Sequence, residues 1–222
     1  MNRNHLPLTI LLLTFLLLLF LGWGLAAWRD YFASPARAGL ILAVLVSAGM
    51  VLLFRLDLQA LRRGRLPVGS QPVVLRALAL ASLGLIWFLP FADRRQIFTF
   101  KDPGMLRYVG LLLCSAGIAL RLLALAKLGR QFSAYVTLQE GHQLVQSGIY
   151  RMIRHPLYLS LLLAAPGMAL VFDSTLVWPI LGIAAMFVAT RIRHEEKLLK
   201  SEFGRSFDAY QSRSWRLLPL IF

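Results

Sequence analysis

The chain has 222 residues, of which 58% are hydrophobic and 15% are charged, and its formal net charge is +14. Because the charges gather between long apolar runs, the composition argues against a water-soluble globule and indicates a multi-spanning membrane protein. No basic stripe with interleaved aromatic residues is present, so membrane topology and anionic lipid explain the positive charge and no nucleic-acid partner is expected.

Six apolar segments follow one another along the chain, and each is a candidate membrane span. In order they cover residues 8–28, 38–54, 73–91, 106–128, 157–172 and 175–189. The first exceeds the apolar core of a typical signal peptide, so we expect it to be retained. Arg76 interrupts the third segment near its start, and Arg121 lies toward the far end of the fourth. We predict an all-α fold, a multi-spanning helical bundle with about six spans.

The last two apolar segments are separated by only two residues, which predicts a tight C-terminal helical hairpin with arms that are short for spans. Positively charged residues are more numerous in the loops after the second and fourth segments and in the C-terminal tail. This excess predicts that both termini are cytoplasmic, and the Leu- and Arg-rich composition favours a bacterial inner membrane. Arg94, Arg95 and Lys101 would lie on the opposite side.

We divide the chain into two parts, since every candidate functional residue lies in its second half. Residues 1–105 are predicted to be N-terminal membrane scaffold, and residues 106–222 a functional core. The single cysteine, Cys114, lies in an apolar run, and no Cys/His spacing typical of a metal site occurs, so no metal is expected. Small residues that would allow close helix packing do not define an oligomeric state.

The segment 127–156 is too long and polar to be a span, and we expect it at the cytoplasmic interface. Turns are predicted around Glu140–His142 and at Gly148, with a short strand or turn over His142–Val145. Arg154 and His155 precede Pro156, a residue well tolerated in a first helical turn. Helix N-terminal amides beside a guanidinium form an anion site, although basic residues before a span also simply snorkel toward the interface.

Two adjacent acidic residues, Glu195 and Glu196, follow the sixth apolar segment and are expected to begin a tail helix that ends at Phe203–Gly204. Adjacent helical residues point about 100° apart, so we expect only one glutamate to face the membrane site. The simpler alternative is a surface ion pair between Glu196 and Lys200 at helical spacing.

These residues form two long gapped patterns. The first is His142-x-Leu-Val-x-x-Gly-x-Tyr-Arg-x-x-Arg-His-Pro-x-Tyr158, and the second is Glu-Glu-x-x-Leu-x-x-x-Phe-Gly-x-x-x-x-x-Tyr-x-x-Arg, over residues 195–213. Together they resemble the isoprenylcysteine carboxyl methyltransferase family of integral membrane enzymes, over roughly residues 128–219. Ile149, Ser160 and Phe207 depart from residues that are frequent in that family.

The resemblance implies an enzyme that uses S-adenosylmethionine as methyl donor, held without a Rossmann sheet, and a lipophilic or lipidated acceptor that arrives from the bilayer. The residues predicted to bind the cofactor are His142, Leu144, Val145, Gly148, Tyr150, Arg154, His155, Tyr158, Glu195 and Glu196. The residues predicted to be catalytic are Arg154, Arg213 and Glu196. As a hypothesis, the arginines hold a carboxylate and the glutamates hold the cofactor amino group or ribose.

Three alternatives remain open from the sequence. Phospholipid amine methyltransferases share much of the pattern, and an amine acceptor would need a general base such as His155 or a glutamate. Membrane sterol reductases carry a similar Arg-His-Pro-x-Tyr segment and would use NADPH. A non-enzymatic lipid-binding protein is a third class, against which the density of ionisable groups near lipid argues.

Overall fold

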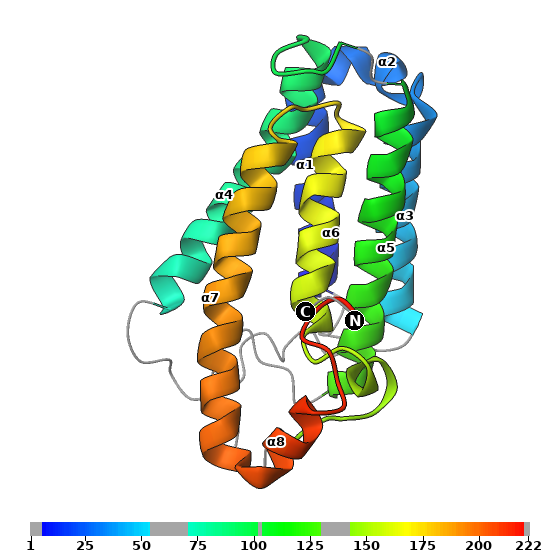
Figure 1. Cartoon of the computed structure of the whole chain (residues 1–222). Helices are drawn as coiled ribbons and strands as arrows, with labels where there is room; N and C mark the ends of the chain where they lie inside the picture. Colours follow the sequence, from blue (N-terminus) through cyan, green and yellow to red (C-terminus); the bar gives the residue numbers. More distant parts are fainter. Residues whose placement is uncertain (1–5, 54–70, 102–103, 130–142, 220–222) are drawn as a thin grey trace.

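The molecule is a bundle of long helices that run up and down along one axis (Figure 1). The computed structural model describes residues 6–53, 71–101, 104–129 and 143–219. Its helices are α1 (Leu6–Trp23), η1 (Leu25–Ala27), α2 (Trp28–Phe32), α3 (Pro35–Leu53), α4 (Gln71–Arg94), α5 (Gly104–Leu128), η4 (Gly148–Arg151), α6 (Pro156–Val171), α7 (Val177–Phe203) and α8 (Arg205–Gln211). The described residues otherwise pair only in two isolated bridges, so the all-α prediction is confirmed.

The number of candidate spans is smaller than the six that the apolar segments predict. Within the described residues, α3, α4 and α5 are long and apolar enough to cross a membrane, and a fourth span results if α1 and the segment Leu25–Phe32 count as one. Helix α6 is apolar but has 16 residues, about 24 Å of helix. The apolar part of α7 soon reaches Arg191 and Arg193. The sidedness of the bundle and the kind of membrane stay predictions.

The first predicted span is not continuous, because the chain bends by 88° after Trp23. Gly24 has a φ of 102°, a conformation that residues with a Cβ avoid. A Cβ at Gly24 would also lie 2.0 Å from a guanidinium nitrogen of Arg94, which donates a hydrogen bond to the carbonyl of Trp23. The helix therefore ends at Trp23 and the chain turns across the end of the bundle as α2.

Helix α5 packs against α3 on one side and α6 on the other, α1 packs against α4, and α6 packs against α7. At the end of the bundle where α2 lies, Trp23, Tyr31 and Phe172 belong to one buried apolar cluster. A buried ion cluster lies at the same end: Asp93 accepts hydrogen bonds from Arg37 (3.0 Å) and Arg107 (2.7 and 2.6 Å). This pairing neutralises part of the positive charge that the sequence puts on that side.

The C-terminal hairpin is present, but its second arm differs from the prediction. The expected sixth span and the expected tail helix are one continuous helix, α7, of 27 residues. It ends at Phe203 as expected, before Gly204 with a φ of 48°. Since α7 is longer than α6, it carries Glu195 and Glu196 past the start of α6 into the polar end of the molecule.

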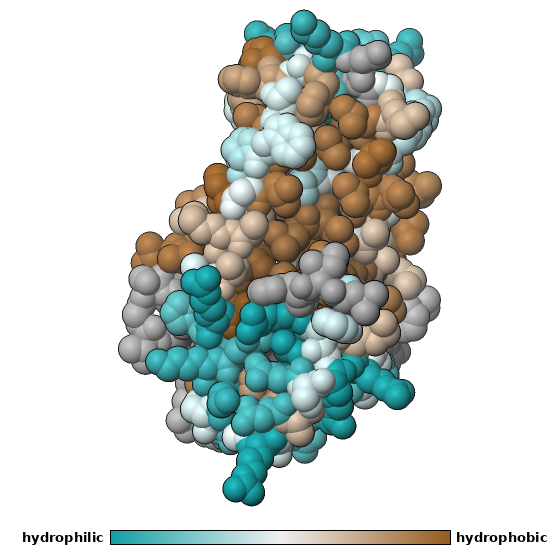
Figure 2. Space-filling model, in the orientation of Figure 1, coloured by the Kyte–Doolittle hydropathy of each residue, from teal (hydrophilic) through white to brown (hydrophobic). Residues whose placement is uncertain are grey.

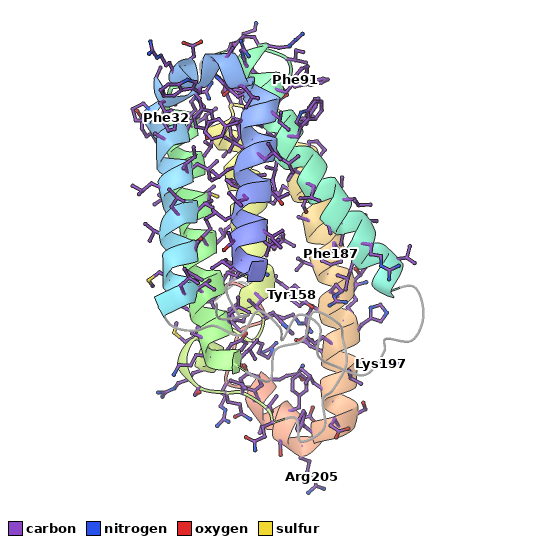
Figure 3. The ribbon with its side chains drawn as sticks, turned by 180° about the vertical axis from the view of Figure 1, so that it is seen from behind. Phe32, Phe91, Tyr158, Phe187, Lys197 and Arg205 are labelled. Carbon is purple, nitrogen blue, oxygen red and sulfur yellow. The ribbon has the colours of Figure 1, made fainter. Side chains whose placement is uncertain are left out.

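The surface divides into an apolar belt and a strongly polar end, with a smaller polar patch at the opposite end (Figure 2). Phe32 and Phe91 lie toward the end of the bundle with α2, whereas Lys197 and Arg205 lie at the strongly polar end (Figure 3). The polar end is built from the last turns of α7, from α8 and from the C-terminal tail, and it brings together most of the residues that the sequence marks as functional.

Candidate functional site

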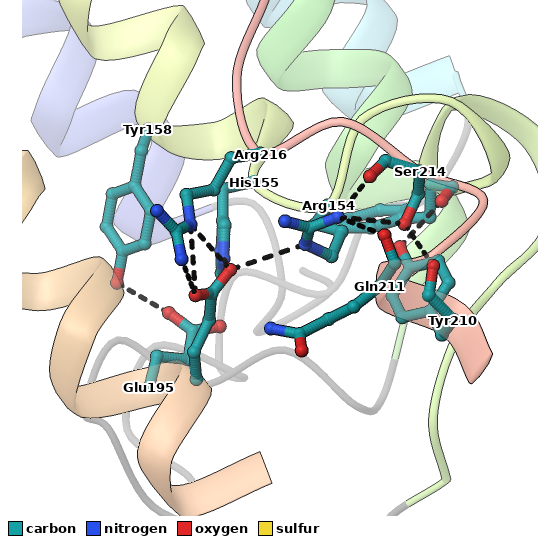
Figure 4. A network of polar contacts seen from close by, with 10 residues as sticks. Arg154, His155, Tyr158, Glu195, Tyr210, Gln211, Ser214 and Arg216 are labelled. Atoms are coloured by element: carbon teal, nitrogen blue, oxygen red, sulfur yellow. Dashed lines mark hydrogen bonds and ion pairs between the residues drawn. The ribbon is translucent and has the colours of Figure 1, made fainter. Parts of the chain in front are cut away.

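The site is built where two remote segments pair side by side. The backbone nitrogens of Arg154 and His155 donate to the carbonyls of Trp215 (2.7 Å) and Arg216 (3.1 Å), and the nitrogen of Trp215 donates to Met152 (2.8 Å). This short parallel pairing fixes the chain just before α6 against the C-terminal tail. This pairing places the side chains of Arg154, His155 and Arg216 close together, and they point toward α7 (Figure 4).

Glu196 is the centre of this arrangement, which we call the Glu196 network (Arg154, His155, Glu196 and Arg216). Its Oε1 accepts from Arg154 Nε at 3.3 Å, His155 Nε2 at 3.2 Å and Arg216 Nε at 3.1 Å. Its Oε2 lies 2.8 Å from Arg216 Nη2. Burial alone would raise the pKa of the Glu196 carboxyl, but hydrogen bonds from His155 and Arg216 outweigh it and hold the pKa at about 2. The carboxylate is therefore ionised at neutral pH.

Arg154 also holds the C-terminal tail. Its Nη1 donates to the carbonyl of Gln211 at 3.1 Å, to the hydroxyl of Ser214 at 3.2 Å and to the carbonyl of Ser214. Ser214 in turn donates to the carbonyl of Tyr210 at 2.5 Å. The sequence predicts Arg154 as an anion-binding residue. In the structure its donors bind Glu196 and backbone carbonyls, so Arg154 holds α7 and the tail together.

Both adjacent glutamates of α7 contact the start of α6, whereas only one was expected to do so. Tyr158 donates to Glu195 Oε2 at 2.7 Å, and Arg191 Nε donates to the Tyr158 hydroxyl at 3.3 Å. The alternative of a surface pair between Glu196 and Lys200 does not form, since Lys200 pairs with Asp208 at 2.9 Å. Helix α7 therefore presents two carboxylates, of which Glu195 is half-buried and Glu196 buried.

Tyr150 and Gly148 shape the loop that leads into the site. Tyr150 is buried, and its carbonyl accepts a 2.6 Å hydrogen bond from the hydroxyl of Tyr210. Burial raises the pKa of the Tyr150 phenol, which is a neutral hydrogen-bonding group at physiological pH. Gly148 has a φ of 61°, and a Cβ there would lie 2.6 Å from the side chain of Lys127. Glycine thus allows the loop to turn closely over the end of α5.

The remaining predicted residues lie at the edge of the site or outside the described residues. Leu144 and Val145 are half-buried in an extended stretch without regular structure, and His142 lies outside the described residues. Arg213 is exposed and donates to the side chain of Gln146, away from the Glu196 network. The structure therefore does not bring Arg213 together with Arg154 and Glu196.

Arg216 was not among the predicted site residues, although it makes the shortest ion pair of the Glu196 network. Neither helical period nor motif marks it, because it lies beyond the second pattern in a tail without regular structure. Ser214 was missed for the same reason, whereas Gln211 lies within the second pattern at a position that the pattern leaves undefined and contributes only its backbone carbonyl. The available signal was the accumulation of basic residues in the tail, which was attributed to membrane topology and anionic lipid.

Residues 108–201 match the model of the isoprenylcysteine carboxyl methyltransferase (ICMT) family. Over this segment, the chain is similar to the ICMT family. The segment begins in α5 and ends in α7, so it includes Arg154, His155, Tyr158 and both glutamates, whereas Arg216 lies beyond it.

Similar sequences come from a plant and a bacterium. The chain is 31% identical over 124 residues to a probable protein-S-isoprenylcysteine O-methyltransferase of Oryza sativa subsp. indica, covering 54% of this chain and 65% of that protein. It is 34% identical over 100 residues to the cobalt-zinc-cadmium resistance protein CzcN of Cupriavidus metallidurans, covering 44% and 46%. The chain thus spans about half to two thirds of the length of these relatives.

A solved structure of the eukaryotic intramembrane Ras methyltransferase ICMT has a similar fold. The TM-score is 0.57 at 21% sequence identity, and the match covers 92% of this chain and 73% of that chain. Because the sequence identity is low, this likeness concerns the fold alone, a bundle of helices.

Proposed function

We propose that the protein is an integral membrane methyltransferase that transfers a methyl group from S-adenosylmethionine to the carboxylate of a lipophilic, isoprenylcysteine-like acceptor. The observation that carries the proposal is the Glu196 network at the start of α6, formed by residues of the ICMT segment together with Arg216 of the tail. We also retain the proposed division into a scaffold (1–105) and a core (106–222).

The described residues offer polar groups that suit this cofactor. Its ammonium and ribose hydroxyls are hydrogen-bond donors, and the two carboxylates of α7 are acceptors beside the start of α6. Glu195 uses Oε2 toward Tyr158, so Oε1 is the atom we assign to the cofactor. Tyr150, His155 and the half-buried Leu144 and Val145 are assigned to the nucleoside part. When bound, S-adenosylmethionine supplies an electrophilic methyl group on a sulfonium.

The chain's own residues would contribute position rather than proton transfer. A carboxylate acceptor is ionised near pH 7 and needs alignment and removal of water, which proximity provides. Glu196 and Arg154 fix the start of α6 to α7 and to the tail. They thereby keep the groups that bind the cofactor and the groups that bind the acceptor at fixed positions relative to each other. In this proposal both are positioning residues, and the exposed Arg213 has no role in the transfer itself.

An amine acceptor is less well supported by the arrangement of His155. Because Glu196 is ionised, the Nε2 of His155 that lies 3.2 Å from it carries the ring proton. This nitrogen is a donor and is engaged, so it is not free to accept a proton from an amine. An amine acceptor would thus have to deliver its proton to Nδ1 of His155 or to Oε1 of Glu195, whereas a carboxylate acceptor needs no base.

The proposal is tested by methyl transfer with purified protein in detergent. Radiolabelled S-adenosylmethionine is supplied with N-acetyl-S-farnesylcysteine or with phosphatidylethanolamine, and lipid-extractable label is counted. We expect label in the farnesylcysteine ester, its loss in Glu196→Gln, and unchanged transfer in the control Glu202→Gln, a change at an exposed position of α7. Label only in the phospholipid would reassign the acceptor, and label in neither would refute the proposed activity.

A further inference from the structure

Arg121 lies on the face of α5 that packs against α6, near the end of that contact. The buried residues of α5 are Gly110, Cys114, Gly117 and Ala124, which recur at helical spacing and form one stripe. Arg121 continues this stripe, four residues after Gly117 and three before Ala124. Its side chain is nevertheless exposed, so α6 does not cover it as it covers the rest of the stripe.

The register of the two antiparallel helices explains the exposure. A Cβ at Gly110 would lie 2.6 Å from the carbonyl oxygen of Gly167, and a Cβ at Gly117 would lie 2.7 Å from that of Ser160. One turn beyond Gly117, Arg121 therefore reaches the level of the first turn of α6, which begins at Pro156. Arg121 lies at the level where α6 begins, next to the turn that carries Tyr158 and faces the site.

Arg121 has no ion pair or hydrogen bond with any residue of the described ranges. An arginine in an apolar helix without a partner is costly and marks function more often than structure. In contrast, the nearby Arg154 and Arg216 direct their donors at Glu196 and, in the case of Arg154, at carbonyls of the tail. An anion arriving at the start of α6 would thus find an uncommitted guanidinium on α5.

We propose that Arg121 binds the carboxylate of a reactant at the boundary between the apolar belt and the polar end. The inference rests on the proposed function and deepens it. Two carboxylates could meet Arg121: that of the lipophilic acceptor and that of the amino-acid part of S-adenosylmethionine. Its position within an apolar helix favours the acceptor, because the hydrocarbon chain can lie along the belt while the carboxylate reaches the planar guanidinium.

A direct consequence concerns substrate and product. Methylation converts the acceptor carboxylate into an uncharged ester, which cannot form an ion pair with Arg121. The protein should therefore bind the acid more tightly than the ester, and Arg121 would promote both selective substrate binding and product release.

The test compares binding of N-acetyl-S-farnesylcysteine with binding of its methyl ester to detergent-purified protein by isothermal titration calorimetry, without any methyl transfer. Wild-type protein should bind the acid at least about tenfold more tightly than the ester, as expected for one charge-assisted contact. Arg121→Gln should abolish this preference, and Arg121→Lys should restore part of it. Arg76→Gln, which changes an exposed arginine in the first turns of α4, should retain the full preference.

A parallel titration with S-adenosylmethionine separates the two sources of the carboxylate. Weaker cofactor binding in Arg121→Gln, with an unchanged acid preference, would assign Arg121 to the cofactor carboxylate. Unchanged binding of both ligands in Arg121→Gln, or no acid preference in the wild type together with unchanged cofactor binding in the variant, would overturn the inference. If the acid preference depends on Arg121 but the wild type does not bind S-adenosylmethionine, the proposed function fails while the anion site stands.

Discussion

The imidazole of His155 and the carboxylate of Glu196 lie 3.2 Å apart and join the residue that precedes α6 to the middle of the polar half of α7. This contact closes the α6–α7 hairpin at the end opposite its connection. Because Arg154 and Arg216 share the same carboxylate, the hairpin, the loop before it and the C-terminal tail form one unit. The predictions below test this unit and the chemistry assigned to it.

Replacing Glu196 with Gln should weaken both the fold and cofactor binding. The change leaves Arg154 and Arg216 close together without their anion, and loss of one partner from a largely buried pair costs about 2–4 kcal/mol. Thermal unfolding in detergent and equilibrium binding of S-adenosylmethionine provide the measurements. The exposed Glu202→Gln should match the wild type, and an unchanged melting temperature in Glu196→Gln would contradict the central place of this carboxylate.

The contribution of Glu196 to stability should depend on pH in a defined direction. Its pKa is lowered from 4.5 to about 2 in the folded protein, so the ionised form favours folding. The stabilisation is complete above pH 4.5 and is lost as the pH falls through 2. The stability difference between wild type and Glu196→Gln should be constant from pH 5 to 8 and should shrink at lower pH, as followed by thermal unfolding. A difference that grows on acidification would be inconsistent with this pairing.

Tyr158→Phe should weaken S-adenosylmethionine binding by about three- to tenfold, the usual effect of one lost hydrogen bond that orients a charged group. The phenol holds Oε2 of Glu195 at 2.7 Å, so its loss frees this carboxylate to rotate. Tyr108→Phe is the matched control, since Tyr108 is exposed and lies near the start of α5. Equal dissociation constants for the two variants would exclude an orienting role for Tyr158.

The two arginines of the tail should differ in importance. Arg216→Gln removes two nitrogens that contact Glu196, whereas Arg213→Gln removes an exposed contact with Gln146. We expect methyl transfer to fall at least about tenfold in Arg216→Gln and less than about twofold in Arg213→Gln. The reverse order in initial rates would restore the sequence-based assignment of Arg213 as the catalytic arginine.

Asp173→Asn should stabilise the protein at neutral pH. Burial raises the pKa of this carboxyl to about 6; Arg107, at 3.8 Å, lowers it and Asp93 raises it. Within the described part of the chain, neither carboxylate oxygen has a hydrogen-bond partner. A raised pKa favours the folded state at low pH, and this advantage is lost as the pH rises through 6. The φ of 55° at this position suits Asn as well as Asp.

We expect Asp173→Asn to gain about 1–3 kcal/mol at pH 7.5, and the gain to vanish below pH 4. Thermal unfolding of the wild type and the variant across this range measures it. Destabilisation of the variant at pH 7.5 would show that the charge is required by the ion cluster around Asp93.

Much of the fold follows from apolar runs and from the proline and glycine residues at helix ends, because these signals depend only on residues that are close in sequence. The start of the first apolar run, the proline at the start of α6 and the glycine after Phe203 each locate a helix end within a few residues. The bend at Gly24 and the union of the sixth apolar segment with the tail helix were not predicted. Both depend on what the chain packs against, since Arg94 occupies the space beside Gly24 and the polar half of α7 is held by α6 and the tail.

The site was predicted to the extent that motifs mark it. Arg154, His155, Tyr158 and both glutamates do come together. The role of Arg216 could not be predicted from the sequence, because its position depends on a parallel bridge between Ile153 and Trp215. Pairing between remote, irregular segments leaves no periodic pattern in the sequence. That Arg121 finds no partner among the described residues likewise depends on where α6 begins relative to α5, which only the packed helices define.

The most direct test of the central claim is equilibrium binding of S-adenosylmethionine and of NADPH to the detergent-purified protein, with an Arg154→Ala, Glu196→Ala double variant as control. A methyltransferase predicts saturable S-adenosylmethionine binding that the double variant loses, and no NADPH binding. Saturable NADPH binding without S-adenosylmethionine binding would contradict the methyltransferase assignment and place the protein among membrane reductases.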